Sequence, residues 1–299
     1  MIDQPWLNPL SSQLRLLAAQ QQLPHALLLS GARGTGKQPL ASELAGYLLC
    51  RQPAADQACG QCKSCLLFKA GHHPDLWTSP AEQHTGVDAI RQLTQFMQGA
   101  AQQGGQKIAI LRDVELMSEA AANALLKTLE EPPQNSFLLL LCAHPAQLLP
   151  TIRSRCQQWS VAPAFGDEVR LWLERHSSRP VPDFLLDYTG GAPLLALELL
   201  ETDKAAAISA QLLMLEQYVA QKLDLYHLLQ ALPDDEQLPM TLNWFIKQQL
   251  WQRASSLQAK QLQLVSKLQQ WQKDRALVAG QNSQLNLAAL LLSIRAALV

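Results

Sequence analysis

Gly31-Ala32-Arg33-Gly34-Thr35-Gly36-Lys37-Gln38 is the stretch of this chain that decides its fold. An apolar run at residues 26–29 precedes it and a helix-like segment follows it, which is the strand–loop–helix context of a phosphate-binding loop, or P-loop. In such a loop the glycines let backbone N–H groups close around phosphates, and the lysine reaches the outer phosphates. We therefore expect a nucleotide-type site at Gly31, Gly36 and Lys37.

The last residue of this loop departs from the motif. A Ser or Thr hydroxyl at that position would hold Mg²⁺, but this chain has Gln38. Mg²⁺ demands tight octahedral geometry from small, hard oxygen ligands, so an amide is a poor substitute. We therefore expect that ATP and Mg²⁺ are not bound productively and that the chain does not turn over ATP.

A second acidic motif, Asp113-Val114-Glu115, follows an apolar segment. Asp113 stands where a P-loop NTPase carries the Asp that supports Mg²⁺, but Val114 takes the place of the acid that often polarises the attacking water. Glu115 comes one residue late, and in an extended segment it would point to the opposite face. The alternative is that Asp113 only ends a strand or caps the residues after it. Together with Gln38, the motif indicates lost hydrolysis.

The composition of the whole chain sets limits on its class. It has 299 residues, of which 48% are hydrophobic and 16% are charged, and its formal net charge is −1. These values indicate folded domains, and they exclude a strongly cationic protein that coats nucleic acid by itself. The N-terminus shows no basic region followed by an apolar stretch, and no run of about 18 apolar residues appears. We therefore expect a cytoplasmic protein with no membrane partner.

The first half of the chain alternates short apolar runs with helical patterns, which is typical of a parallel α/β sheet. The expected strands are residues 26–29, 75–78, 107–111, 137–142 and 158–161. The helical patterns between them cover residues 38–49, 87–98 and 119–129, and prolines end the last one. After residue 166 only helical periods occur, at 168–175, 183–188, 193–200, 205–221, 225–232, 239–251, 256–271 and 285–298.

These patterns predict three domains. An α/β domain covers residues 1–162, a small helical domain covers residues 163–204, and a larger helical domain covers residues 205–299. The last domain carries leucine stripes with weakly charged flanks, which suit helix-to-helix association. Its glutamines fit either such an interface or a plain solvated surface, and they are Gln258, Gln261, Gln263, Gln269, Gln270 and Gln272.

Four of the six cysteines form the pattern C-x8-C-x2-C-x2-C within residues 50–65. Four thiolates at this spacing suit a tetrahedral structural Zn²⁺ site with no open position, so we expect zinc that takes no part in catalysis. The alternatives are an accidental cluster of free thiols and an iron–sulfur cluster; the upstream fourth cysteine and the missing C-x3-C-P favour zinc. The expected ligands are Cys50, Cys59, Cys62 and Cys65, and the expected packing thiols are Cys142 and Cys156.

Several motifs together resemble one known family. They are the P-loop at 31–37, the four-cysteine insert, the run Asn123-Ala124-Leu125-Leu126-Lys127-Thr128-Leu129-Glu130-Glu131-Pro132-Pro133, and the motif Ser154-Arg155-Cys156. In this combination and order the chain resembles a bacterial clamp-loader subunit of the AAA+ class over roughly residues 1 to 200. The resemblance implies an AAA+ α/β P-loop domain with a parallel sheet, a small helical lid, and an all-helical collar that oligomerises.

Within that family the chain is more similar to the delta-prime subunits than to the ATP-hydrolysing gamma/tau subunits. The gamma/tau subunits carry a complete P-loop, an adjacent Asp-Glu pair, and a lid arginine in a Gly-Ser-x-Arg-Asp context. Gln38, Val114 and Leu194 stand at the matching positions here. Delta-prime subunits are similar in that they keep the fold and the Ser-Arg-Cys motif but lose turnover.

The resemblance implies a rigid, non-hydrolysing stator in a heteropentameric clamp loader, within a DNA polymerase holoenzyme (a nucleotidyltransferase complex). Its partners would be the gamma/tau and delta subunits, the sliding clamp, and primer–template DNA. Arg155 would act in trans on ATP held by a neighbouring subunit, and Arg153 is the poorer choice. The vestigial nucleotide site would be Gly31, Gly36, Lys37 and Asp113.

Two rival functions stay open at this stage. One is a working clamp-loader-type AAA+ ATPase of the same fold, in which Lys37 suffices for hydrolysis. The other is a nucleic-acid-binding zinc module on an inactive NTPase scaffold. That module would require a basic face on the insert, where only Arg51, Lys63 and Lys69 are basic.

Overall fold

A computed structural model describes residues 4–54, 57–80, 85–103, 105–235, 237–252, 259–277 and 283–298. The chain forms two compact units: residues 1–176 with 189–196, and residues 177–188 with 197–299. The division into three domains at residues 162 and 204 stays a prediction.

The first unit is built on a five-stranded sheet in the order β2-β3-β4-β1-β5, and every neighbouring pair is parallel. β1 pairs with both β4 and β5, with Leu27 opposite Leu139 on one side and Gln157 on the other. The predicted parallel α/β class is therefore confirmed. The strands are β1 (Ala26–Ser30), β2 (Leu76–Thr78), β3 (Lys107–Leu111), β4 (Ser136–Cys142) and β5 (Gln157–Ser160).

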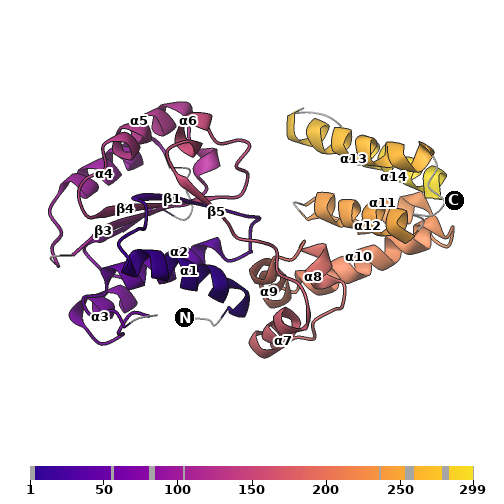
Figure 1. Cartoon of the computed structure of the whole chain (residues 1–299). Helices are drawn as coiled ribbons and strands as arrows, with labels where there is room; N and C mark the ends of the chain where they lie inside the picture. The colour runs from indigo at the N-terminus through magenta and orange to yellow at the C-terminus, as the bar shows by residue number, and fades with distance from the viewer. Residues whose placement is uncertain are drawn as a thin grey trace. The chain divides into compact units, whose positions relative to one another are not determined.

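Helices cover both faces of this sheet. Alternate residues of a strand point to opposite faces, so Leu28 packs into one core and its neighbour Leu27 into the other. Burial on both faces explains why the central strands are almost entirely apolar. In Figure 1, α4, α5 and α6 lie on one side of the sheet and α1 and α2 on the other. The helical elements are η1 (Pro5–Leu7), α1 (Asn8–Ala19), α2 (Lys37–Leu49), α3 (Lys63–Lys69), α4 (Val87–Gln98), η2 (Val114–Leu116), α5 (Glu119–Glu130), α6 (Pro150–Arg153) and α7 (Asp167–His176).

The described residues of the second unit fold into helices. Tyr188 and Thr241 share a buried hydrogen bond of 3.0 Å between their hydroxyl oxygens, beside the ring of Trp244. The predicted helix at 256–271 is observed from residue 259 onward, and Gln258 lies outside the described residues. The helices are α8 (Leu185–Tyr188), α10 (Lys204–Val219), α11 (Leu225–Ala231), α12 (Leu238–Gln252), α13 (Ala259–Leu277) and α14 (Ser283–Leu298), while α9 (Pro193–Glu201) runs from the first unit into the second.

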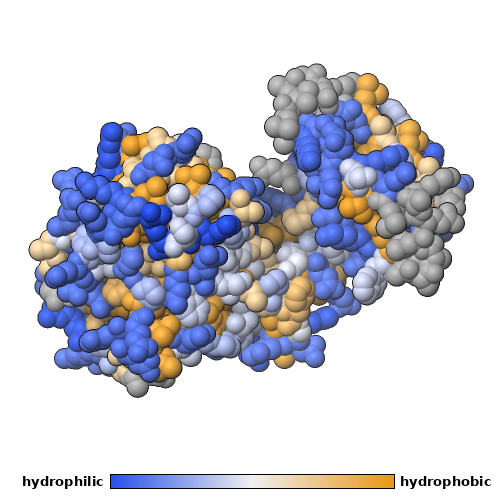
Figure 2. Space-filling view, turned by 45° about the horizontal axis from the view of Figure 1, so that its top comes forward, coloured by the Kyte–Doolittle hydropathy of each residue, from blue (hydrophilic) through white to orange (hydrophobic). Residues whose placement is uncertain are grey.

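The surface of each unit mixes polar and apolar residues. Figure 2 shows mainly hydrophilic atoms on the visible face, with smaller hydrophobic areas scattered among them. Such scattered apolar residues are ordinary for a folded chain. Among the described helices, none is both long enough and apolar enough to cross a membrane.

Candidate functional site

The P-loop joins the end of β1 to the start of α2, as the sequence predicts. Gly34 and Gly36 have φ values of +84° and +111°, a backbone region that favours glycine. Gly36 is also crowded, because a Cβ there would lie 2.8 Å from Cδ1 of Leu7. The N-terminal segment is tied to the loop by Trp6, whose indole N–H donates to the carbonyl oxygen of Thr35 at 2.8 Å.

Lys37 is turned onto its own loop. Its ammonium donates to the carbonyl oxygen of Gly31 and, at 2.9 Å, to that of Ala32, and the residue is only 9% exposed. Burial lowers the pKa of Lys37, while the nearby carboxylates of Glu115 and Asp113 oppose that shift. The cation that would contact phosphates in a working P-loop is therefore bound by backbone oxygens of this chain.

The first turn of α9 lies against the same loop. The backbone N–H of Leu194 donates to the carbonyl oxygen of Gly34 at 3.0 Å. A Cβ on Gly34 would come within 2.5 Å of Cβ of Leu195, so the two backbones are in close contact. Leu194 stands where the resemblance to gamma/tau subunits expects the lid arginine. This position therefore lies at the P-loop but carries an apolar side chain.

A cleft of about 480 Å³ remains beside the loop. The predicted nucleotide residues Gly36, Lys37 and Asp113 line it, together with Gln38 and Leu194, among other residues. The side-chain oxygen of Gln38 is buried and has no hydrogen-bond partner in the described part of the chain. An unpartnered amide therefore occupies the place of the Mg²⁺-binding hydroxyl.

The acidic motif does not have the geometry predicted for it. Asp113 adopts a left-handed conformation with φ +48° directly before η2, so the segment turns instead of remaining extended. Glu115 consequently lines the same cleft as Asp113, and its Oε1 accepts backbone N–H groups from Ala143 at 2.7 Å and His144 at 3.2 Å. The prediction that Glu115 points to the opposite face was wrong, because that prediction assumed an extended strand end.

Arg155 lies in the turn between α6 and β5, and it is not among the residues that line the cleft. Its Nη2 forms an ion pair with Oε1 of Glu130 at 2.6 Å, and its Nη1 donates to the carbonyl oxygen of Thr151 at 2.9 Å. The side chain keeps 37% of its surface exposed. Beneath it, Cys156 is buried in the core, and this burial raises the pKa of its thiol to about 12.

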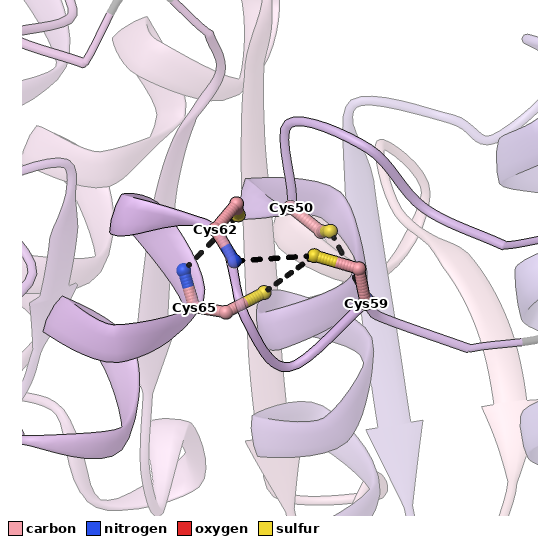
Figure 3. Close-up of side chains that lie close together, drawn as sticks. All are labelled: Cys50, Cys59, Cys62 and Cys65. Carbon is pink, nitrogen blue, oxygen red and sulfur yellow. Dashed lines mark hydrogen bonds between the residues drawn. The ribbon is translucent and has the colours of Figure 1, made fainter.

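The four predicted zinc ligands lie close together, as Figure 3 shows. Cys50 directly follows α2, Cys59 lies in the loop after it, and Cys62 and Cys65 lie at the start of α3. Their sulfur atoms all lie within 4.8 Å of one another. A tetrahedron of Zn–S bonds of about 2.3 Å requires S···S distances of about 3.8 Å, so only a small contraction is needed. Residues of this kind and arrangement fit a structural Zn²⁺ ion, and the ligand set would be Cys50, Cys59, Cys62 and Cys65.

Backbone amides support these thiols as metal ligands. The N–H groups of Cys59, Cys62 and Cys65 donate to the sulfurs of Cys50, Cys59 and Cys62 at 3.3, 3.4 and 3.4 Å. Hydrogen bonds from the backbone N–H groups of Arg51 and Cys65 lower the pKa of the Cys62 thiol to about 6, whereas burial raises that of Cys65 to about 12. The N–H donors favour the thiolate form that binds metal.

A buried polar network that sequence reasoning missed holds the insert against the sheet. The hydroxyl of Ser64 donates to the carbonyl oxygen of Leu49 at 2.5 Å and lies 2.7 Å from Nε2 of His73. Nδ1 of His73 accepts the backbone N–H of Asp75 at 3.1 Å. The proton on the imidazole is therefore at Nε2, and all three side chains are at least 95% buried.

Comparison with known proteins agrees with these motifs. Residues 6–164 match the family model described as "DNA polymerase III, delta subunit". The chain is 40% identical over 256 residues to DNA polymerase III subunit delta' of Pseudomonas aeruginosa, covering 81% of this chain and 74% of that protein. It is 38% identical over 245 residues to subunit delta' of Escherichia coli, covering 80% and 73%.

Similarity to subunit tau covers less of the chain. Subunit tau of Escherichia coli is 37% identical over 153 residues, which is 51% of this chain and 24% of tau. Among solved structures, a DNA polymerase III gamma subunit-related protein from Thermotoga maritima has a TM-score of 0.57 at 19% identity, covering 96% of this chain and all of that one. That likeness supports the fold alone. Taken with the site geometry, the matches show that the chain belongs to the delta-prime subunit family of DNA polymerase III.

Proposed function

We propose that this chain is a non-hydrolysing stator subunit of a bacterial clamp loader, and that Arg155 acts on ATP held by a neighbouring subunit. The observation that carries the proposal is the contrast between two sites. In the P-loop, Lys37 is held by backbone oxygens of its own chain, while the guanidinium of Arg155 is accessible at the surface.

The residues of the P-loop give the reason why no hydrolysis is expected here. A working site needs a hydroxyl for Mg²⁺ and backbone N–H groups directed at phosphates. In this chain Gln38 offers an amide, and the ammonium of Lys37 is bound to backbone carbonyls. ATP binding would have to draw the ammonium of Lys37 away from these carbonyl oxygens. The remaining nucleotide residues therefore preserve the fold without supporting turnover.

Arg155 has the properties that a trans-acting residue requires. Its guanidinium is planar, permanently charged and able to form two parallel hydrogen bonds to phosphate oxygens. An arginine supplied in this way stabilises charge on the transferring γ-phosphate and is worth about 10³–10⁵ in rate. Arg153 is less suited, because it is half-buried, whereas Arg155 is exposed.

The other parts of the chain would serve assembly. We assign residues 1–162 to the AAA+ domain, 163–204 to the lid, and 205–299 to a collar that oligomerises. Collar helices expose large apolar residues that an interface would bury, including Leu213, Trp251 and Leu285.

The proposed partners are gamma/tau and delta subunits, the sliding clamp, and primer–template DNA through the assembled complex. With a formal net charge of −1, the chain would contact DNA through a local feature such as helix N-termini. The proposed location is the cytoplasm. The zinc held by the four cysteines would be structural, because a closed Cys₄ site leaves no coordination position for a substrate.

The test compares two arginines of one loop in a reconstituted clamp loader that contains a gamma-type ATPase, delta, the clamp and primed DNA. Arg155→Ala should lower DNA-stimulated ATP hydrolysis strongly, and Arg153→Ala should lower it far less. Circular dichroism and gel filtration should show unchanged folding and assembly for both variants. Wild-type ATP hydrolysis by the complex that contains Arg155→Ala would refute the trans role of Arg155.

The alternative hypothesis, that this chain is a working ATPase, is supported by one observation: Lys37 and Asp113 line the same cleft. It predicts that the purified chain alone binds ATP and hydrolyses it steadily. Finding neither binding nor hydrolysis removes this rival.

A further inference from the structure

We propose that Glu130 is a positioning residue for the guanidinium of Arg155, an inference that rests on the proposed trans role of Arg155. Oε1 of Glu130 lies 2.6 Å from Nη2 of Arg155, although 25 residues separate the two in the chain. Glu130 is the last residue of α5, and Arg155 follows α6. The ion pair therefore spans two elements of one unit.

The backbones on both sides of this ion pair are fixed by the core. Leu129, next to Glu130, is 2% exposed, and Ile152, three residues before Arg155, is fully buried in the same cluster. Close-packed neighbours of this kind leave little freedom for the backbones. Only the outer parts of the Glu130 and Arg155 side chains, 49% and 37% exposed, reach the surface.

The two shortest contacts of the guanidinium come from different elements. Glu130 binds Nη2, and the carbonyl oxygen of Thr151 accepts from Nη1 at 2.9 Å. A guanidinium has five N–H groups, so hydrogens remain for phosphate oxygens after these contacts are made. Holding a long side chain beforehand reduces the conformational entropy that is lost when it meets its ligand. These contacts thus orient the guanidinium of Arg155 and leave some of its N–H donors available for phosphate oxygens.

The position of Glu130 is unfavourable for the helix that carries it. A carboxylate in the last turn is repelled by the negative end of the helix dipole, where cations are favoured. Pro132 and Pro133 force α5 to end here, so Glu130 lies in that last turn. Arg155 offsets the repulsion by its positive charge. We infer that Glu130 is placed for its contact with Arg155 and not for the stability of α5.

Glu131 provides a matched control for this carboxylate. It is the next residue, it is exposed, and among the described residues it has no ion pair. Glu131→Gln therefore makes the same change of charge one residue away from the contact. Any effect of net charge or of the helix dipole should be common to both positions.

The test measures ATP hydrolysis by the reconstituted clamp loader with Glu130→Gln, Glu131→Gln, Arg155→Ala and the double variant Glu130→Gln/Arg155→Ala. Glu130→Gln should lower kcat about two- to fivefold, the size expected for losing an exposed ion pair. Glu131→Gln should match the wild type. In the Arg155→Ala background, Glu130→Gln should have no further effect, because the side chain that it positions is gone.

The outcomes separate this inference from the proposed function. If Arg155→Ala lowers activity but Glu130→Gln equals wild type, the positioning role is refuted and the trans role stands. If Glu130→Gln lowers activity equally with and without Arg155, it acts through general structure and the inference is again refuted. If Arg155→Ala leaves ATP hydrolysis unchanged, both the trans role of Arg155 and the positioning role of Glu130 are refuted.

Discussion

The backbone N–H of Leu194 donates a hydrogen bond to the carbonyl oxygen of Gly34 at 3.0 Å. This contact joins two segments that lie 160 residues apart, the first turn of α9 and the P-loop. The first N–H groups of a helix have no partner within the helix and are common sites for anions. Here one of them is satisfied by the loop that would otherwise bind phosphate.

Restoring the missing hydroxyl should therefore not restore hydrolysis. In Gln38→Thr the loop regains a Mg²⁺ ligand, but Leu194 remains on Gly34 and Lys37 on its carbonyl partners. We expect no steady ATPase activity from this purified variant, measured beside Gln38→Ala. Steady ATP hydrolysis by the Gln38→Thr variant would contradict this expectation, because it would show that residue 38 alone prevents hydrolysis.

The close approach at Gly34 should make this position intolerant of a side chain. In Gly34→Ala the new Cβ would lie 2.5 Å from Cβ of Leu195, at a φ of +84°. Gly71→Ala is the matched control, because its φ is +75° and nothing lies within 4 Å of the place that a new methyl group would take. Gly34→Ala should lose about 1–3 kcal/mol more unfolding free energy than Gly71→Ala in urea titrations. Equal losses would contradict a tight contact.

The four-cysteine site should bind about one zinc ion per chain, and Cys62→Ser should lose that metal. Metal analysis of the purified protein measures both values. Because the insert is organised by its sulfurs, we also expect faster proteolysis near residues 50–65 in the variant. Cys156→Ala, which lies outside the cluster, should keep its zinc. A coloured, iron-containing protein would overturn the zinc assignment.

The two remaining cysteines should be inert thiols in the folded chain. Burial raises the pKa of both Cys142 and Cys156 to about 12, well above the usual value of 9.0. Their neutral forms are therefore favoured by folding. The resulting stability is complete below about pH 9 and is lost as the pH rises from there towards 12.

Alkylation mapped by mass spectrometry checks this expectation. At pH 8 the native protein should show no modification of Cys142 or Cys156, whereas the urea-unfolded protein should be modified at both. Modification of either residue at equal rates in the two states would contradict its burial.

Much of the sheet could be predicted from the sequence, because each buried strand is a short apolar run. The β3 segment 107–111 and α4 at 87–98 are observed at their predicted bounds. α1 was missed, although Pro9 in its first turn was a usable signal. α3 was missed because its N-cap is the sulfur of Cys62, a residue that helix-capping preferences do not include.

The candidate site was predictable where a sequence motif identified its members, as for Lys37 and Asp113, which line one cleft. Spacing alone identified the four cysteines that the fold brings together. The predicted direction of the Glu115 side chain was wrong because Asp113 takes a left-handed conformation, which no local sequence pattern predicts. The pair of Glu130 and Arg155 depends on how α5 packs against α6, so sequence reasoning named the arginine but not its partner.

The central place of β1 in the sheet has a consequence for how the chain is made. β1 pairs only with β4 and β5, and about 130 residues separate Leu27 from its partner Gln157. At a synthesis rate of about 5–20 residues per second, the ribosome needs roughly 7–26 seconds to supply them. For most of that time β1 has left the ribosome without either neighbour, because β4 is made only shortly before β5, and the P-loop beyond it has no sheet to anchor it. The nascent chain therefore exposes an apolar strand, which the folded sheet buries, well before its two partner strands are available.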